Sequence, residues 1–266
     1  MNIASWLQAA INQLKYADIQ TARLDALVLL SDVTGHDKSW ILAYPEHDLQ
    51  GSEIELLNTK IVQRTQHIPL AYIRGRAEFY GREFIVNEHT LVPRPETETM
   101  IDLLKTLQPP AGTSILDVGT GSGCIAITAK LELPHTTIGA CDIDEQCVQT
   151  AIRNAENLHA NVSFFASNLL ASASPADIIL ANLPYVPDTF HINTAATHEP
   201  AHAIYGGADG LDLYRTMFRQ IDTLGQPQHI LTEALPTTHH TLTSIAHSAG
   251  FDLVQTEDFI QHFSRR

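Results

Sequence analysis

Short apolar segments alternate with stretches of helical periodicity from about residue 114 to the end of the chain. This order is typical of an α/β fold, in which a doubly wound, mostly parallel sheet is joined by right-handed crossovers. Ligands of such sheets bind at the carboxyl ends of the strands, so we expect a site there. The expected strands are 114–118, 137–142, 162–166, 177–181, 229–233 and 251–256.

The first seventy or so residues have a different rhythm. From residue 5 to 74 the periodicity is helical, with Leu24, Leu27, Val28 and Leu30 at spacings that place them on one helix face. Ser52 and Glu55 form a possible capping box. We therefore expect a small helical bundle at the amino-terminal end.

Aromatic and branched residues surround Gly81 in the segment 79–86, which predicts a β-hairpin. The hairpin would connect the bundle to the α/β region. The expected organisation is a helical bundle at 1–76, a hairpin linker at 77–93 and a catalytic domain at 94–266.

Composition narrows the class of protein. The chain has 266 residues and 44% hydrophobic content, which is ample for a packed core. Its net charge of −14 is unfavourable for binding a phosphate backbone, because such binding rests on Lys and Arg. The charge favours a protein or small-molecule substrate over direct binding of nucleic acid. We expect a monomer.

Cysteine use and the amino terminus indicate a compartment. Cys124, Cys141 and Cys147 have no CxxC spacing, and an odd count argues against a secreted disulfide scaffold, so we expect buried packing residues. Residues 1–14 alternate polar and apolar side chains and lack a basic leader followed by an apolar run. We expect neither a signal peptide nor a membrane span, and a cytoplasmic location.

A glycine-rich turn follows the first expected strand and includes Gly119, Gly121 and Gly123. A dinucleotide fingerprint requires its last glycine where Cys124 stands, so the spacing favours S-adenosylmethionine instead. Glycine permits close approach of the backbone to a ligand. Asp142 ends the second expected strand, where its carboxylate can accept both ribose hydroxyls. The expected cofactor contacts of the turn are Asp117, Gly119, Thr120, Gly121, Ser122 and Gly123.

The sequence Asn182-Leu183-Pro184-Tyr185 closes the fourth expected strand, beside the expected cofactor site. An amide or aromatic amine is a poor nucleophile because its lone pair is delocalised. The Asn182 side-chain oxygen and the Leu183 carbonyl can accept its two hydrogens, while Tyr185 offers a flat face for stacking. Pro184 restricts the backbone of Leu183. The motif predicts methyl transfer from S-adenosylmethionine to an sp2 NH2 group.

The segment from His198 to His202 satisfies the letter of the zinc-protease pattern H-E-x-x-H. Pro200 lies between the histidines and disfavours the helix that such a site needs, so we expect no metal.

The segment 94–98 precedes the first strand. Its proline and carboxylates suit both a helix start and a site, and spacing alone leaves the choice open.

Taken together, these segments resemble the release-factor glutamine methyltransferases, and the resemblance runs along most of the chain. It implies a class I S-adenosylmethionine-dependent methyltransferase fold with a seven-stranded catalytic domain, and an amino-terminal helical domain that recognises a class I peptide chain release factor. The methylated group would be the side-chain amide of the glutamine in the factor's Gly-Gly-Gln motif. The segments that carry the resemblance are 23–26, 69–73, 78–81, 91–98, 116–126, 182–185, 199–200 and 206–211.

The resemblance also implies roles for single residues. Asn182, Leu183, Pro184 and Tyr185 would clamp the glutamine, Asn182 would also touch the cofactor, and Arg94 and Glu96 would belong to a flap near the pocket. Three departures stand out. Leu183 replaces the family's first proline. Asn168 and Leu169, next to the adenine ring, replace an Asp and a large aromatic residue. The segment 257–263 leaves little room for the family's last strand.

Two rival functions come from other classes. The motif at Asn182 also resembles the rRNA adenine dimethyltransferases, which act on the exocyclic amine of adenine. Those enzymes need a basic surface, and they would not explain the helical bundle or the segment 93–98. The other rival is a binding module that keeps the cofactor fold but has lost turnover through the changes at Asn168, Leu169 and Leu183.

Overall fold

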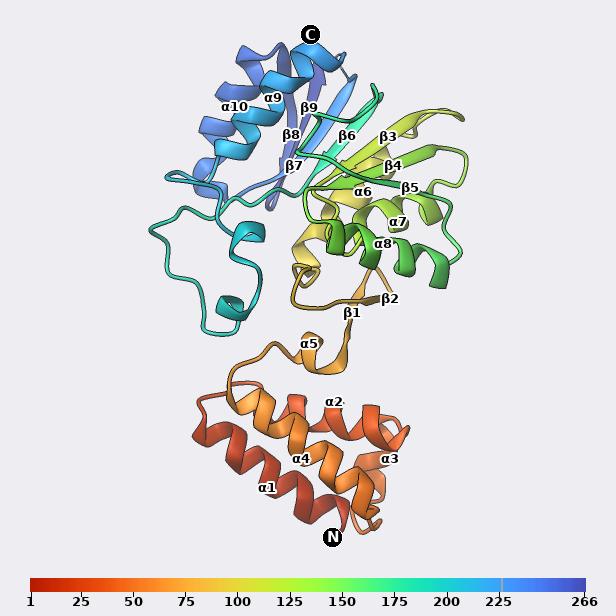
Figure 1. Cartoon of the computed structure of the whole chain (residues 1–266), viewed down its shortest axis with the longest axis vertical. Coiled ribbons are helices and arrows are strands. Elements are labelled where there is room, and N and C mark those ends of the chain that lie inside the picture. The colour runs from red at the N-terminus through yellow and green to blue at the C-terminus, as the bar shows by residue number, and fades with distance from the viewer. Residues whose placement is uncertain (226) are drawn as a thin grey trace. The chain divides into compact units, whose positions relative to one another are not determined.

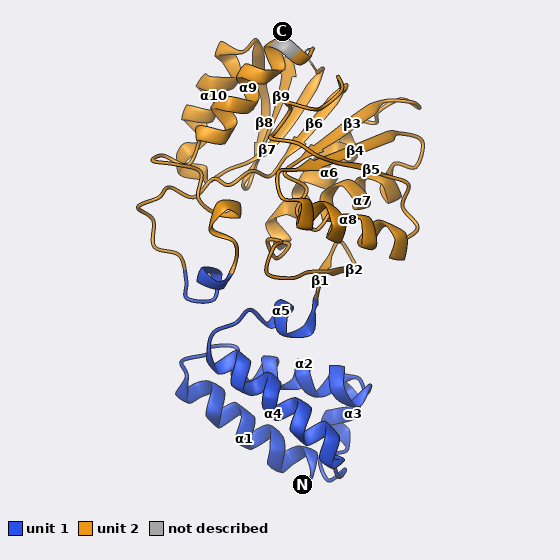
Figure 2. Ribbon diagram, in the orientation of Figure 1, with its two compact units in different colours: residues 1–75, 193–198 blue, residues 76–192, 199–266 orange. Residues whose placement is uncertain are grey.

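The computed structural model describes residues 1–225 and 227–266. The chain folds into two compact units (Figures 1 and 2). One unit contains residues 1–75 together with the short segment 193–198, and the other contains residues 76–192 and 199–266. The chain thus leaves the second unit once, at residue 193, and returns to it at residue 199.

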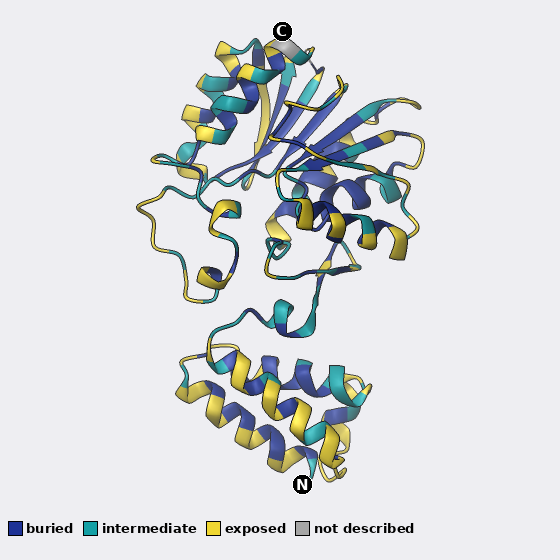
Figure 3. Cartoon of the chain, in the orientation of Figure 1, coloured by how far each residue is buried: buried dark blue, intermediate teal, exposed yellow. Residues whose placement is uncertain are grey.

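The first unit is a helical bundle around a single apolar core (Figure 3). Trp6, Leu14 and Leu30 are among its most deeply buried side chains. A buried ion pair joins Arg64 to Asp25, with 2.7 Å between Nε and Oδ2. The helices are α1 (Ile3–Tyr16), α2 (Ala22–Thr34), α3 (Lys38–Ala43), α4 (Gly51–Thr65) and α5 (Leu70–Arg74).

Two details of the bundle differ from the sequence-based expectation. The capping box of α4 is formed by Gln50 and Glu53, since the Glu53 carboxylate accepts from the Gln50 N–H at 2.8 Å. The expected pair Ser52 and Glu55 lies inside the helix, two residues too late. Leu24 is 52% exposed, because the buried face of α2 is set by other residues, Leu27 and Leu30 among them.

The second unit contains a seven-stranded sheet with the order β5-β4-β3-β6-β7-β9-β8. The first five strands in this order are parallel, and β9 is antiparallel to both of its neighbours. The doubly wound α/β fold is confirmed. The strands are β3 (Ser114–Val118), β4 (Thr137–Asp142), β5 (Ser163–Ala166), β6 (Ile178–Ala181), β7 (His229–Glu233), β8 (Phe251–Glu257) and β9 (Ile260–Arg265).

Helices cover both faces of this sheet (Figure 1). One apolar core contains residues of α6 (Glu98–Thr106), α7 (Cys124–Glu132) and α8 (Glu145–Asn157), and the other contains residues of α9 (Asp212–Leu224) and α10 (His239–Ser248). Side chains alternate along each strand, so successive residues such as Ile115 and Leu116 enter different cores. The central strands β3, β6 and β7 are therefore buried on both faces, whereas the edge strands β5 and β8 are largely exposed (Figure 3).

The expectation that the segment 257–263 leaves little room for a last strand was wrong. β9 runs over six residues and pairs with both β7 and β8, so it completes the sheet. A two-residue turn is enough to reverse the chain, because Asp258 adopts a left-handed conformation with φ of 49°. The expected hairpin before the sheet is confirmed as β1 (Arg76–Phe79) and β2 (Arg82–Ile85). The second unit also contains the short 3₁₀ turns η1 (Pro95–Thr97), η3 (Ala201–Ala203) and η4 (Pro236–Thr238). A fourth turn, η2 (Ala196–His198), lies in the segment 193–198, which is grouped with the first unit.

The three cysteines are buried and form no disulfide, as expected. Burial raises the pKa of the Cys124 and Cys141 thiols to about 12, so both are protonated at neutral pH. Across the part of the chain that the structure describes, no helix is long and apolar enough to cross a lipid bilayer.

A histidine pair between β7 and β9 generates a prediction about stability. His262 Nε2 lies 3.0 Å from His229 Nδ1, and burial lowers the pKa of His262 from 6.5 to about 4. The unfolded chain therefore binds a proton that the folded chain excludes between these values, and stability is lost as the pH falls from 6.5 towards 4. We expect His262→Asn to reduce this acid sensitivity by on the order of 1 kcal/mol.

Urea unfolding of both proteins at several pH values measures this difference. The exposed His240 supplies the control, since His240→Asn should follow the wild-type dependence on pH. Parallel curves for wild type and His262→Asn would contradict the prediction.

Candidate active site

A hollow lies at the carboxyl ends of the strands of the second unit. The pairing of β3 with β6 places Val118 opposite Ala181, so the segments that follow these two strands begin side by side. The hollow thus forms where the expected cofactor turn meets the expected clamp. Its wall includes residues from the segments 89–97, 119–125, 142–147, 167–169, 182–184 and 202–203, together with Leu213.

Two glycines of the turn, Gly119 and Gly123, have neighbours that leave little room for a side chain, whereas nothing lies within 4 Å of a Cβ added at Gly121. Gly119 adopts φ of 76°, and a Cβ added there would stand 3.0 Å from the Leu183 side chain. Gly123 caps α7 with φ of 81°, and its added Cβ would stand 2.9 Å from Ala151. Gly119 thus permits contact between the turn and the clamp, whereas Gly123 packs α7 against α8 and does not line the hollow.

Asp142 lies at the end of β4 with both carboxylate oxygens held by backbone amides. Oδ2 accepts from the Gly121 N–H at 2.9 Å, and Oδ1 accepts from the Asp144 N–H at 3.0 Å. Burial raises the pKa of Asp142, while these two hydrogen bonds favour its charged form. Each oxygen keeps a further lone pair, so the carboxylate can still accept two hydroxyl donors from the hollow.

Asp117 does not line the hollow, although the sequence predicts a cofactor contact there. Its side chain is fully buried, and Oδ2 accepts from the Thr120 hydroxyl at 2.6 Å. Burial raises the pKa of Asp117 to about 7. Asp117 therefore holds the glycine turn through the Thr120 hydroxyl, from a buried position near the end of β3.

The opposite wall carries Asn168 and Leu169, the two departures from the family pattern. Leu169 is buried and adopts a left-handed conformation with φ of 52°. Ile143, next to Asp142, also lines the hollow with a side chain that is 63% exposed. A planar base could pack against these apolar side chains while its ribose meets Asp142.

Asn182 is oriented by Thr97, because Asn182 Nδ2 donates to Thr97 Oγ1 at 3.1 Å. This bond uses the amide nitrogen and leaves Asn182 Oδ1 as an acceptor at the hollow. The Leu183 N–H donates to the Tyr214 hydroxyl at 3.2 Å, and this bond fixes the peptide that joins Asn182 to Leu183, which precedes the one that carries the Leu183 carbonyl. The wall of the hollow therefore includes both residues that the sequence predicts as acceptors.

Tyr185 lies outside the wall of the hollow. Its hydroxyl donates to Glu233 Oε1 at 2.9 Å, and burial raises the pKa of Tyr185. The ring is partly buried. Its position is thus set by β7, which ends at Glu233.

Arg94 lines the hollow and is anchored to Glu199. Arg94 Nη2 donates to Glu199 Oε1 at 2.6 Å, and the Val92 N–H donates to Oε2 at 3.0 Å. Glu199 therefore acts as a brace for the segment 92–94, between the turns η2 and η3 that Pro200 separates. Glu96, the other expected flap residue, is exposed and lies off the wall.

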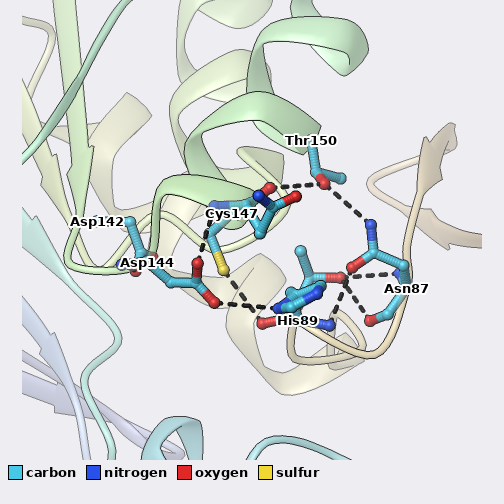
Figure 4. A network of polar contacts seen from close by, with 8 residues as sticks. Asn87, His89, Asp142, Asp144, Cys147 and Thr150 are labelled. Carbon is cyan, nitrogen blue, oxygen red and sulfur yellow. Dashed lines mark hydrogen bonds and ion pairs between the residues drawn. The ribbon is translucent and has the colours of Figure 1, made fainter.

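The outer wall beside Asp142 is a polar network between the segment 87–90 and the start of α8 (Figure 4). His89 Nδ1 lies 3.2 Å from Asp144 Oδ2, and the Cys147 thiol donates to the His89 carbonyl at 3.1 Å. Asn87 Nδ2 donates to the Thr150 hydroxyl at 3.0 Å. Both His89 and Cys147 line the hollow, and the sequence analysis assigned them no role.

The structure brings most expected site residues to one hollow, and three further residues hold the clamp, Thr97 from the wall itself and Tyr214 and Glu233 from behind it. Thr97, Tyr214 and Glu233 contact the clamp from η1, α9 and β7. The sequence could have indicated Glu233, because this residue ends a strand at the same edge of the sheet as Asn182. The expected residues on the wall are Arg94, Gly119, Thr120, Gly121, Ser122, Asp142, Asn168, Leu169, Asn182, Leu183 and Pro184; those off it are Glu96, Asp117, Gly123 and Tyr185.

Two family models match the chain. The PrmC N-terminal domain matches residues 5–75, and the methyltransferase small domain matches residues 98–208. A release factor glutamine methyltransferase of Koribacter versatilis is 36% identical over 228 residues, which cover 83% of this chain and 81% of the relative. One of Bacillus subtilis is 36% identical over 207 residues, covering 73% and 72%.

The chain belongs to the release factor glutamine methyltransferase family. Its fold is also that of a solved methyltransferase from Pyrococcus furiosus, with a TM-score of 0.52 at 18% identity, covering 81% of this chain and 96% of that one. Family membership and the glycine turn agree on the expected cofactor. The donors and acceptors around Gly121 and Asp142 fit it, because ribose hydroxyls require an acceptor where Asp142 stands.

Asp142 is the most direct test of this cofactor site. We expect Asp142→Ala to weaken binding of S-adenosylmethionine about ten- to a hundred-fold, since charge-assisted hydrogen bonds to the ribose are lost. Isothermal titration calorimetry measures the affinity. Asp222→Ala removes the same charge from an exposed position of α9 and should bind like wild type. Equal affinities for all three proteins would remove Asp142 from the site.

Proposed function

We propose that this chain transfers a methyl group from S-adenosylmethionine to the side-chain amide nitrogen of the glutamine in the Gly-Gly-Gln motif of a class I peptide chain release factor. The observation that carries the proposal is the pair of acceptors at one hollow, Asn182 Oδ1 and the Leu183 carbonyl, next to the glycine turn. Membership of the family supplies the class of substrate.

The two acceptors match what an amide nitrogen needs. Its lone pair is delocalised into the carbonyl, so the nitrogen is a weak nucleophile. Hydrogen bonds from its two N–H groups to Asn182 and Leu183 increase the electron density on nitrogen and hold its lone pair in one direction. S-adenosylmethionine supplies the electrophilic methyl group: its sulfur–methyl bond would break as the nitrogen–methyl bond forms, with S-adenosylhomocysteine as the leaving group. The nitrogen gains a methyl group and loses one proton, which ends in solvent.

A protein substrate is favoured over a nucleic acid for two reasons. The net charge of −14 opposes binding to phosphates, and residues 5–75 match the PrmC N-terminal domain rather than a nucleic-acid-binding module. We propose that this helical unit docks the release factor. A cytoplasmic location and a monomeric state also stay part of the proposal.

Mass spectrometry of a recombinant release factor tests the function. Incubation with this chain and S-adenosylmethionine should add one methyl group to the peptide that contains the Gly-Gly-Gln motif. A release factor with Gly-Gly-Glu at this place is the matched control, since it lacks the amide and should gain nothing. An unmodified glutamine peptide, or methyl transfer to ribosomal RNA under the same conditions, would contradict the proposal.

Removing the side-chain acceptor tests the clamp. We expect Asn182→Ala to lower the single-turnover rate about a hundred-fold at saturating cofactor, the scale for loss of one preorganised hydrogen bond in a transition state. Cofactor affinity should change little. Asn161→Ala, at an exposed position outside the hollow, is the control. Wild-type turnover by Asn182→Ala would mean that this motif does not hold the amide.

The Leu183 peptide generates a second kinetic prediction. Proline at 183, the family's usual residue, would place its ring where the Leu183 N–H now meets Tyr214 Oη, at an N–O distance of 3.2 Å. We therefore expect Leu183→Pro to slow methyl transfer by displacing Tyr214. Tyr214→Phe should also slow it, because a buried N–H loses its acceptor.

The two changes should compensate each other when combined. The double variant has neither the clash nor the unpaired N–H, so its single-turnover rate should exceed the product of the two separate effects, with a coupling of about 1–2 kcal/mol. Rates for the four proteins complete the cycle. Strict additivity would mean that Tyr214 does not act on the clamp through Leu183.

A further inference from the structure

The clamp residues share partners on β7, the strand next to the one that precedes the clamp. The parallel register of β6 with β7 places Ala181 opposite Thr232, so Asn182 and Glu233 follow at the same level of the sheet. Glu233 is 1% exposed and lies off the wall of the hollow. A carboxyl group that is buried so deeply needs nearby donors, and within ordinary hydrogen-bond geometry only Oε1 has one among the described residues, while Oε2 has none.

Those donors are groups that also hold the clamp. The Tyr185 hydroxyl donates to Glu233 Oε1 at 2.9 Å. Burial raises the pKa of Glu233, and hydrogen bonding from Thr97, from Tyr185 and, more weakly, from Asn182 itself lowers it. Thr97 is also the residue that accepts from Asn182 Nδ2 at 3.1 Å. The Thr97 hydroxyl can accept from Asn182 and donate its own proton to Glu233, so one carboxyl group is linked to both Tyr185 and Asn182.

The direction of these bonds decides which atom of Asn182 meets the substrate. Glu233 is an acceptor when it is charged, so the Thr97 hydroxyl points its proton towards Glu233 and its lone pair towards Asn182. This arrangement selects the amide nitrogen of Asn182 for Thr97 and leaves Oδ1 at the hollow. If the amide turned over, Asn182 would present a donor to the substrate N–H, which would be repulsive.

The backbone of Glu233 holds the other half of the clamp. Tyr214 donates its hydroxyl proton towards the carbonyls of Glu233 and Ala181, and accepts from the Leu183 N–H. Side chain and main chain of a single residue are therefore connected to both acceptors of the clamp.

We propose that Glu233 is a positioning residue for methyl transfer, which sets the orientation of the Asn182 amide through Thr97 and that of Tyr185 directly. The proposal rests on the proposed function and adds to it a buried residue that touches neither substrate nor cofactor. Its effect should appear in the rate of the chemical step and leave cofactor binding unchanged.

Three variants test the role in the full chain. Glu233→Gln introduces a donor that competes for the Thr97 hydroxyl, so we expect the single-turnover rate on the release factor to fall about tenfold, the effect of about 1.4 kcal/mol in hydrogen bonding. The affinity for S-adenosylmethionine should stay within about twofold of wild type. Thr232→Val is the matched control, since Thr232 is equally buried on the same strand, faces the other side of the sheet and bonds to Gln261.

The third variant separates positioning from general stability. Thr97→Val/Tyr185→Phe removes the two hydroxyl donors to Glu233 and leaves only Asn182 beside it, so adding Glu233→Gln to it should cause a much smaller loss of rate than in wild type. An undiminished effect of Glu233→Gln in this background, a wild-type rate for the single variant, or a parallel loss of cofactor affinity would overturn the proposal. If Glu233→Gln fails to fold, Thr97→Val alone decides, with the same tenfold loss expected and a wild-type rate contradicting the role.

The wild-type rate is measured first. A wild-type chain that does not methylate the release factor would count against the proposed function. A wild-type rate that Glu233→Gln leaves unchanged would count against Glu233 alone.

Discussion

The parallel pairing of β3 with β6 is the constraint on which the site depends. It brings the turn after Val118 and the motif after Ala181 to one edge of the sheet, although the two are separated by more than fifty residues of chain. The turn and the motif must also approach each other closely. Gly119 has no Cβ, so Leu183 can pack against the turn; a Cβ there would stand 3.0 Å from Leu183 Cδ2, so the Leu183 side chain would have to shift.

Behind this edge lies a second layer of polar groups whose burial is costly. Asp117 and Glu233 are almost fully buried, and burial raises the pKa of both carboxyl groups. Each is held by hydroxyl donors, Thr120 for Asp117 and Tyr185 for Glu233. Apolar residues would pack there at less cost, so the network is better explained by the geometry that it imposes on the turn and on the clamp.

The sequence predicted the parallel strands well because the central ones, β3, β6 and β7, are buried on both faces and read as apolar runs. β9 was missed for the opposite reason. Gln261 and His262 interrupt its apolar pattern, and they are tolerated in the core because Thr243 and His229 provide hydrogen-bond partners. The residues on the wall of the hollow could be predicted because strand ends converge. The contacts that hold the clamp could not be predicted, since those of Thr97, Tyr214 and Glu233 join positions 31 to 85 residues apart.

The change at Leu183 illustrates how a departure from a family pattern can be absorbed. A proline has no N–H, whereas Leu183 brings an N–H into a site where its side chain is 2% exposed. An unpaired N–H there would cost about 1–3 kcal/mol. The hydroxyl of Tyr214, a residue of α9, provides the acceptor for this N–H. The restraint that the proline ring would place on the backbone thus comes instead from a hydrogen bond, which fixes the peptide between Asn182 and Leu183.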